Sequence, residues 1–426
     1  MPSTPTGNRR QTGPRRDRRS ASRRDRRSAS RRGLLRGLAG AALVGTAGCL
    51  GLEESPFSAG TDANADWPMA RHDPANAAFA PDAAAPRTGV AERWAEDVGF
   101  DVRAPAVVDG TVYAPAAEGL VALDAESGEE RWRFAPTEQP WPSPPVVHDG
   151  VAYVTMVDDD TLHAVDAESG EERWRLAGSG HVHASPHLLA GQLVDDPAIL
   201  VGGHDGVVRA LGPGGDERWS VDAFGSVRAM AYDGRGLYVG TGGGEVYAYF
   251  PEEEAPPREL WRRKVGPQVE GIVPTANGVF VSTFGGPLTN LQDGAHAGTT
   301  RWVAEEAHAG SPPVHAGSWV YSAGWDSLSA LRTYDKNLHW RVGGEFGNVG
   351  PVAAGDTLYV AGEGAIHAFD LDGGLGGGGF TVDAKRWSQP IESGGIQGLA
   401  VGAGALFVAC EGQEAGDPSL FCLEPA

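Results

Sequence analysis

The sequence predicts an all-β protein, an eight-bladed β-propeller in which four-stranded antiparallel blades form a closed ring. Three observations favour this fold class. Tryptophans that close short charged runs recur at intervals of 38 to 47 residues, which is the period of a four-stranded blade. Two of the repeats are nearly identical, LDAESGEERW at 123–132 and VDAESGEERW at 165–174. Glycine is abundant (62) and cysteine scarce (3), as suits many short strands joined by tight turns. The repeated tryptophans are Trp94, Trp132, Trp174, Trp219, Trp261, Trp302, Trp340 and Trp387.

The unit 102–134 shows how one blade is built. Asp109-Gly110 is a strong hairpin signal between two apolar runs, and the loop 124–128 turns the chain again before the tryptophan strand. The same hairpin signal recurs at Asp149-Gly150 and Asp233-Gly234. Four antiparallel strands are therefore expected in each unit. In this first unit they are 104–108, 111–114, 120–123 and 130–134.

The two ends of the repeat array are predicted to complete one another. The chain after Trp387 supplies three further strands, near 398–401, 405–410 and 419–423, without a ninth tryptophan strand. The segment 91–97 from the other end of the array is expected to be the missing outer strand. Such pairing gives eight blades and removes the exposed edges of the ring. Seven blades with one irregular unit are the alternative.

The repeat, with its Asp, its Ser-Gly turn and its outer-strand Trp, resembles the PQQ-like β-propeller repeat of the quinoprotein superfamily. The resemblance extends over roughly 67–426, and its most specific parts are the two AESGEERW segments. In that family the outer-strand Trp docks against the neighbouring blade, and the resemblance implies the same role for the eight tryptophans. A large aromatic ring beside charged groups suits this position, because its face is buried between sheets while its polar edge stays accessible.

The first 48 residues are predicted to be an export signal. They contain 13 Arg against only two Asp, and they end in an apolar stretch, 33–48, that is too short to span a bilayer comfortably. The segment 30–36 resembles the twin-arginine export motif, with Arg31 and Arg32 as the arginine pair and with Leu34 and Arg36 in place of the usual Phe and Lys.

The segment 46–49, Thr-Ala-Gly-Cys, resembles a lipobox, in which the cysteine is lipidated and becomes the mature N-terminus. Cys49 is therefore the expected lipid anchor, and a plain cleaved signal is the alternative. Residues 49–66 are then expected to be a flexible tether, and 67–426 the propeller. This organisation places the protein at the extracytoplasmic face of the cell membrane, held there by the lipid anchor alone.

The propeller and tether are strongly acidic, with 22 basic and 54 acidic residues after position 48. Such a surface repels nucleic acid and anionic headgroups, and it stays soluble where concentrated salt screens self-repulsion. The composition looks like that of a protein from a salt-loving prokaryote, so the resemblance is to a twin-arginine-exported lipoprotein of haloarchaeal type. An ordinary acidic secreted protein is the alternative. Nucleic acid is excluded as a partner.

Few residues suggest chemistry. Cys410 and Cys422 lie 12 residues apart on the two strands of a predicted hairpin, either as a disulfide or as two buried thiols. His181, His183 and His187 alternate along an extended segment, but the segment lacks nearby Cys, Asp or Glu, so a metal site is not expected. The run 158–160 of three Asp lacks the spacing of a calcium loop and is interpreted as a solvated turn.

The mouth of the central channel remains as a candidate binding site. Residues at the start of each blade's first strand would line it, for either a peptide loop or a polar ligand, unless they are merely solvated. These residues are Arg103, Trp141, His183, Arg228, Glu270, His308, Asn348 and Gln397.

These features favour a non-catalytic, monomeric scaffold that binds a protein partner at the cell surface. In the PQQ-dependent alcohol dehydrogenases the cofactor is held with calcium, a catalytic Asp and an adjacent pair of cysteines. This sequence has no Cys-Cys dipeptide, so neither PQQ nor calcium is expected as a cofactor. A PQQ-dependent dehydrogenase or other sugar-oxidising enzyme and a structural surface component are the alternatives.

Overall fold

The computed structural model describes residues 55–426 except 159, 179–183, 192–193, 253–254, 347–348, 363 and 374–383. The expectations for Arg31, Arg32, Cys49, His183 and Asn348 lie outside the described residues. Within them the regular structure is β-strands and one short 3-10 helix, η1 (Gly294–His296). No helix in this part of the chain is long and apolar enough to cross a membrane.

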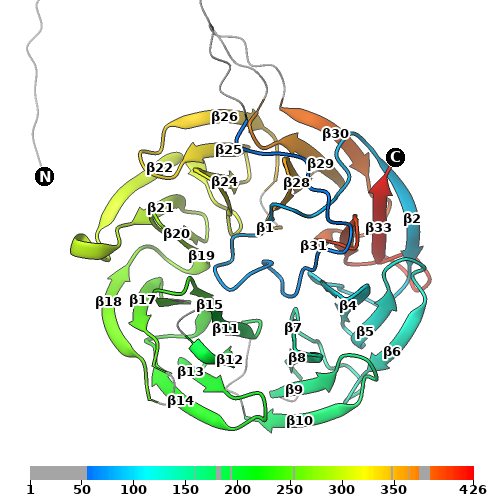
Figure 1. Cartoon of the computed structure of the whole chain (residues 1–426), viewed down its shortest axis with the longest axis horizontal. Coiled ribbons are helices and arrows are strands. Elements are labelled where there is room, and N and C mark those ends of the chain that lie inside the picture. The colour runs from blue at the N-terminus through cyan, green and yellow to red at the C-terminus, as the bar shows by residue number, and fades with distance from the viewer. Residues whose placement is uncertain are drawn as a thin grey trace, which may run out of the picture. The chain divides into compact units, whose positions relative to one another are not determined.

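The strands form eight sheets arranged in a ring, which confirms the predicted all-β, eight-bladed propeller (Figure 1). The seven-bladed alternative is wrong. Blade 1 contains β3 (Ala106–Val108), β4 (Thr111–Ala116), β5 (Gly119–Asp124) and β6 (Glu130–Phe134), and blade 2 contains β7 (Val146–His148), β8 (Val151–Met156), β9 (Thr161–Asp166) and β10 (Glu172–Ala177). Blade 3 contains β11 (His187–Gly191), β12 (Val194–Gly202), β13 (Val207–Leu211) and β14 (Glu217–Asp222). Blade 4 contains β15 (Val227–Tyr232), β16 (Leu237–Thr241), β17 (Glu245–Phe250) and β18 (Arg258–Lys264).

Blades 5 to 8 follow the same antiparallel order, from the inner strand at the axis to the outer strand. Blade 5 contains β19 (Val269–Thr275), β20 (Gly278–Thr283), β21 (Pro287–Leu291) and β22 (Thr300–His308), and blade 6 contains β23 (Val314–Ala316), β24 (Trp319–Ala323), β25 (Ser327–Arg332) and β26 (Leu338–Gly343). Blade 7 contains β27 (Val352–Ala354), β28 (Thr357–Gly362), β29 (Ala365–Asp370) and β30 (Lys385–Pro390). Blade 8 contains β31 (Ile396–Gly402), β32 (Ala405–Cys410), β33 (Leu420–Pro425) and β2 (Val90–Glu96). A two-residue strand, β1 (Phe79–Ala80), adds to blade 7 in parallel with β27.

The ring closes in blade 8, where β2 pairs with β33 as the sequence predicted. The register runs from Val90 opposite Pro425 to Glu96 opposite Leu420. Because the outer strand of this blade comes from the N-terminal side of the array and its other strands from the C-terminal side, the first and last parts of the propeller share one sheet (Figure 1).

The propeller has two faces that differ in their connections. The loop face carries the links between blades and the loops between second and third strands, and these touch one another: the Phe284 amide donates to the Gln268 carbonyl at 2.9 Å. The hairpin face carries the turns between first and second strands and those between third and fourth strands. There the Ala125 amide donates to the Gly110 carbonyl at 3.0 Å.

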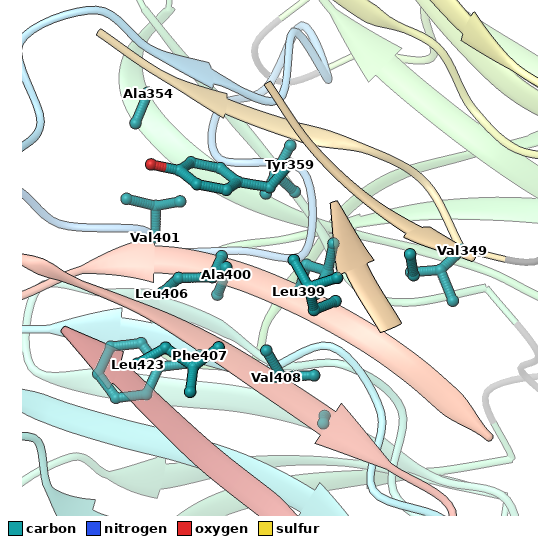
Figure 2. Close-up of a cluster of buried hydrophobic side chains, with 14 of the residues drawn as sticks. Val349, Ala354, Tyr359, Leu399, Ala400, Val401, Leu406, Phe407, Val408 and Leu423 are labelled. Carbon is teal, nitrogen blue, oxygen red and sulfur yellow. The ribbon is translucent and has the colours of Figure 1, made fainter. Parts of the chain in front are cut away.

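Apolar side chains between neighbouring sheets form the core. Figure 2 shows Tyr359 of blade 7 above Leu399, Ala400 and Phe407 of blade 8, and each of these side chains is at most 2% exposed. The close packing explains why second and third strands read as almost continuous apolar runs, because both sheet faces are covered by adjacent blades.

Six of the eight outer-strand tryptophans contact the next blade, as the resemblance implied. An indole N–H donates to a carbonyl in the following blade's outer turn at five of the eight positions. The pairs are Trp94 with Ala125 (3.1 Å), Trp132 with Ala167 (3.1 Å), Trp174 with Pro213 (2.8 Å), Trp302 with Thr333 (3.3 Å) and Trp340 with Leu371 (3.4 Å). The Trp261 ring lies against Gly298 of blade 5, Trp219 is 3% exposed, and Trp387 packs on Tyr359 of its own blade.

Candidate functional site at the propeller axis

A segment that the repeat pattern did not explain crosses the axis of the ring. Residues 65–80, here called the belt, precede every blade in sequence and hydrogen-bond to all eight of them (Figure 1). Proceeding along the belt, its backbone and side chains contact Val107, Val147, His187, Tyr232, Ile272, His315 and Ala353 in blades 1 to 7, and Ala65 accepts from Ala403 in blade 8. The belt therefore fills part of what would otherwise be an open channel.

Two belt side chains are fixed by carbonyl oxygens of distant blades. The amide of Asn76 donates to the carbonyls of Met230 (2.7 Å) and Ile272 (3.1 Å), and Asn76 is buried. Its φ of 56° lies in the left-handed region, which Asn tolerates better than most residues. Asn76 thus links blades 4 and 5 through the belt.

Arg71 makes the equivalent link between blades 6 and 7. Its guanidinium donates to the carbonyls of Pro351 (2.8 Å), Pro313 (2.6 Å) and Pro312 (3.2 Å). Burial lowers the pKa of Arg71 to about 10, and the nearby Asp73 carboxylate opposes this shift. The side chain is therefore charged at neutral pH, with most of its donors already used within the protein.

A cavity of about 230 Å³ lies beside the belt at the axis. Met69, Arg71 and Asn76 line it from the belt, and Arg228 and Glu270 line it from the inner strands of blades 4 and 5. Glu270 accepts a hydrogen bond from Gln268 at 2.7 Å. The structure thus brings two of the predicted mouth residues, of opposite charge, to one cavity.

The other described mouth residues are not among those that line this cavity. Arg103 is in the loop before β3 and pairs with Asp101 at 3.1 Å. Trp141 is in the loop before β7 with φ 48°. Gln397 is the second residue of β31 and is exposed. His308 was expected on a first strand, but it is the last residue of the outer strand β22, because a register irregularity at 305–307 extends that strand.

His187, the one described member of the histidine group, is engaged within the protein. Its ring Nε2 lies 2.8 Å from the Pro74 carbonyl oxygen, to which it donates, and the side chain is buried. Burial lowers the pKa of His187 to about 4. Among the residues that the structure describes, no group of three or more His, Cys, Asp or Glu could hold a metal ion.

The two described cysteines are free thiols, and the sheet register explains why. Cys422 is opposite Phe407 in the β32–β33 ladder, three residues from Cys410. Since side chains alternate along a strand, the two thiols point to opposite faces of the sheet. Both are buried, and burial raises the pKa of each to about 12.

The described residues at the axis do not fit the cofactor that the fold suggests. Pockets for organic ligands of that size usually measure about 300–1,000 Å³, more than this cavity provides. PQQ is a tricarboxylate, and of the two cations lining the cavity Arg71 is already engaged by three carbonyls. The paired cysteines that the resemblance would require are replaced by two thiols on opposite faces of one sheet.

Comparisons with known proteins agree with the fold. The family model described as outer membrane protein assembly factor BamB matches residues 82–200 and 204–308. A search of curated protein sequences finds no match.

Among solved structures, BamB from Moraxella catarrhalis is similar over 79% of this chain and 100% of its own, with 14% identity and a TM-score of 0.58. Quinohemoprotein alcohol dehydrogenase from Comamonas testosteroni matches 84% of this chain and 80% of its own, with 14% identity and a TM-score of 0.58. The computationally designed Ika8 protein matches 78% of this chain and 98% of its own, with 12% identity and a TM-score of 0.61. At these identities the similarity shows the fold.

Proposed function

The chain belongs to the family of the outer membrane protein assembly factor BamB, and from this premise we propose that it is a non-catalytic scaffold that binds another protein at the cell surface. The family and its structural relatives are compatible with a protein-binding scaffold or with a quinoprotein dehydrogenase. The choice between these two functions therefore depends on whether the residues at the axis of the propeller could hold a cofactor.

The belt is the observation that carries the proposal. It crosses the axis, it is bonded to all eight blades, and the cavity beside it that Arg228 and Glu270 line measures about 230 Å³. Such cross-linking favours a rigid platform whose outer surfaces do the binding, and among the described residues no group of three or more His, Cys, Asp or Glu could hold a metal ion.

The sequence supports a location for this platform. Arg31 and Arg32 in the twin-arginine-like motif and Cys49 in the lipobox-like segment favour export followed by lipid anchoring, with a haloarchaeal type of host suggested by the acidic composition. Closure of the ring within one chain, through the pairing of β2 with β33, supports a monomer. We therefore propose a lipid-anchored protein on the extracytoplasmic face of the membrane.

Cofactor titration tests the non-catalytic part of the proposal. The protein is kept in molar salt, where the Debye length is about 3 Å and self-repulsion is screened, and is titrated with PQQ and calcium while tryptophan fluorescence is recorded. We expect no saturable binding and no dye reduction with glucose or alcohols. Binding of one equivalent of PQQ with dye reduction would contradict the proposal and favour the dehydrogenase.

Complex size tests the scaffold part. Membranes of the native host are solubilised in mild detergent at the same salt concentration, and the extract is separated by gel filtration. We expect the protein to elute in a complex larger than its own 44.5 kDa and detergent can explain. Elution at the position of the purified monomer would count against a scaffold.

A further inference from the structure

Exposed aromatic rings are concentrated on the loop face. Five of the seven most exposed aromatic side chains in the described part of the chain lie in its loops: Phe100 (42%), Trp141 (38%), Phe224 (74%), Phe284 (66%) and Trp325 (52%). The other two, Phe250 and Tyr334, are on the hairpin face. Single exposed apolar residues need no explanation, but a cluster on one face is typical of an interaction surface.

The three most exposed of the loop-face rings lie on consecutive blades. Phe224 is in the loop that enters blade 4, Phe284 is in the second-to-third-strand loop of blade 5, and Trp325 is in the corresponding loop of blade 6. We call these three residues the aromatic arc. Blades 4 and 5 also supply Arg228 and Glu270 to the axial cavity, so the arc borders the sector of the ring where that cavity lies.

The arc is held in place by hydrogen bonds of its loop backbones. The Phe224 amide donates to the Tyr247 hydroxyl (2.7 Å), and the Phe284 amide donates to the Gln268 carbonyl (2.9 Å). Beside Trp325, the Gly324 amide donates to the Ser327 carbonyl (2.9 Å). Because these backbones are already ordered, less conformational entropy is lost when a partner covers the rings.

The same face is strongly acidic. Its described loop residues include thirteen Asp or Glu but only one Lys or Arg, Arg103. Asp205, Asp326 and Glu345 lie in loops of blades 3 and 6 and in the link to blade 7, within or next to the sector of the arc. Asp205 pairs with Arg209 at 2.9 Å and Asp326 with Arg341 at 3.5 Å, and all four side chains lie at the same edge of the ring. A cationic side chain is attracted both to carboxylates and to the face of an aromatic ring.

We propose that the aromatic arc and the surrounding acidic loops bind a segment of a partner protein in which Arg or Lys alternates with apolar side chains. This inference rests on the proposed scaffold function and specifies its binding surface. A membrane is a poorer occupant, because the carboxylates would repel anionic headgroups.

The described residues that lead into the belt lie on the other face of the propeller. Residues 57–60 lie against hairpin-face turns: a Cβ on Gly317 would be 3.5 Å from the Phe57 ring, and a Cβ on Gly355 would meet the Gly60 backbone nitrogen. Residues 57–60 therefore lie on the side of the propeller opposite to the aromatic arc.

Peptide binding to two matched variants tests the inference. The arc variant carries Phe224→Ser, Phe284→Ser and Trp325→Ser, and the control variant carries Phe250→Ser and Tyr334→Ser on the hairpin face. All of these side chains are exposed, so both variants are expected to fold, which circular dichroism and thermal unfolding verify. The probes are fluorescein-labelled (Arg-Leu-Gly)4, (Glu-Leu-Gly)4 and (Arg-Ser-Gly)4, titrated by fluorescence anisotropy.

We expect the unmodified protein to bind (Arg-Leu-Gly)4 at least ten-fold more tightly than either other peptide. The arc variant should bind it at least ten-fold more weakly, and the control variant within two-fold of the unmodified protein. No binding of (Arg-Leu-Gly)4, equal loss in both variants, or equal binding of the glutamate peptide would overturn the proposal. Arc-dependent adsorption to phosphatidylglycerol vesicles without peptide binding would also overturn it and favour a membrane.

Gel filtration of membrane extracts separates this inference from the scaffold proposal. If the unmodified protein elutes in a complex and the arc variant does not, both the scaffold function and the aromatic arc as its binding surface are supported. If the arc variant stays in the complex, the scaffold function holds and the arc is not its binding surface. If the unmodified protein elutes as a monomer, the scaffold function itself fails.

Discussion

The indole of Trp132 in blade 1 lies directly against Gly170 in blade 2. A Cβ built on Gly170 would be 2.7 Å from Cδ2 of the ring, and Gly170 has φ 75°. The same indole donates to the Ala167 carbonyl at 3.1 Å. Equivalent contacts join Trp94 to Gly128 and Trp174 to Gly215. The glycine of each Ser-Gly or Gly-Gly turn is thus half of an inter-blade contact as well as a turn residue.

Gly170→Ala is expected to destabilise the protein more than a glycine substitution at an open position. Alanine at positive φ costs about 1–2 kcal/mol, and displacing the Trp132 ring adds about 1–3 kcal/mol. The control is Gly110→Ala, since Gly110 has φ 70° but nothing within 4 Å of the added Cβ. Denaturant unfolding at constant salt measures both. An equal decrease in the free energy of unfolding of the two variants would show that the contact with the Trp132 ring contributes nothing to stability.

Asn76→Ala is expected to loosen the belt. The change removes donors to the Met230 and Ile272 carbonyls and places alanine at φ 56°, so the free energy of unfolding should fall by about 2–4 kcal/mol. Asn64→Ala, at an exposed position nearer the N-terminus, is the matched control and should change it by less than about 0.5 kcal/mol. Limited proteolysis should cut the Asn76→Ala variant within 65–80 first. Cleavage of blade loops before the belt would argue against its bracing role.

His187 is expected to make stability depend on pH between about 6.5 and 4. Burial lowers its folded-state pKa to about 4, below the value of about 6.5 in the unfolded chain. Below pH 6.5 the unfolded chain therefore binds a proton that the folded protein does not, and stability falls as the pH falls, by about 3 kcal/mol in total. His187→Gln retains an amide donor for the Pro74 carbonyl and removes this titration. Thermal unfolding from pH 7.5 to 4 should show a flatter profile for the variant, and identical profiles would refute the assignment.

Both described thiols are expected to be reduced and unreactive in the folded protein. In a Cys49→Ser background, a thiol reagent at pH 8 should modify neither Cys410 nor Cys422 within minutes, because both are buried with pKa values raised to about 12. Two thiols should react once the protein is unfolded. Recovery of no thiols under denaturing, non-reducing conditions would mean that a disulfide forms in spite of the register.

Cys49→Ser is expected to release the protein from the membrane, because lipid chains on this residue would supply the stable anchor. Replacing Arg31 and Arg32 by Lys should instead leave a folded precursor inside the cell. Fractionation and immunoblotting distinguish the two results. Membrane retention of the correctly processed Cys49 variant would exclude lipidation at this position, and unchanged export of the arginine variant would exclude this arginine pair.

The repeat unit and the closure of the ring could be predicted because each has a local sequence signal. The tryptophan period defines the blade, turn residues such as Asp109-Gly110 mark its first hairpin, and the missing outer strand after Trp387 requires a partner from 91–97. These signals come from residues close together in the chain, so periodicity reveals them.

The belt and the cavity could not be predicted in the same way. Belt contacts join residues such as Arg71 and Asn76 to backbone carbonyls far along the chain, and a carbonyl carries no sequence signature. His308 was misplaced for a related reason, because the irregularity at 305–307 lengthens β22 opposite Pro287, and no glycine or proline stands within 305–307 itself. Two local features of the sequence fall in the belt. One is an Asn among Ala residues at 75–78, and the other is the segment Trp-Pro-Met at 67–69, whose tryptophan stands outside the repeat.

The pairing of Val90 with Pro425 has a consequence for synthesis on the ribosome. The outer strand of blade 8 is made first and its neighbour last, so a nascent chain keeps β2 unpaired until translation has almost ended. Contacts so distant in sequence form slowly, and an unpaired strand edge invites association with other chains. The belt emerges even earlier and acquires its eight partners one blade at a time. A chain that ends before β33 therefore leaves β2 without its partner strand and the ring open.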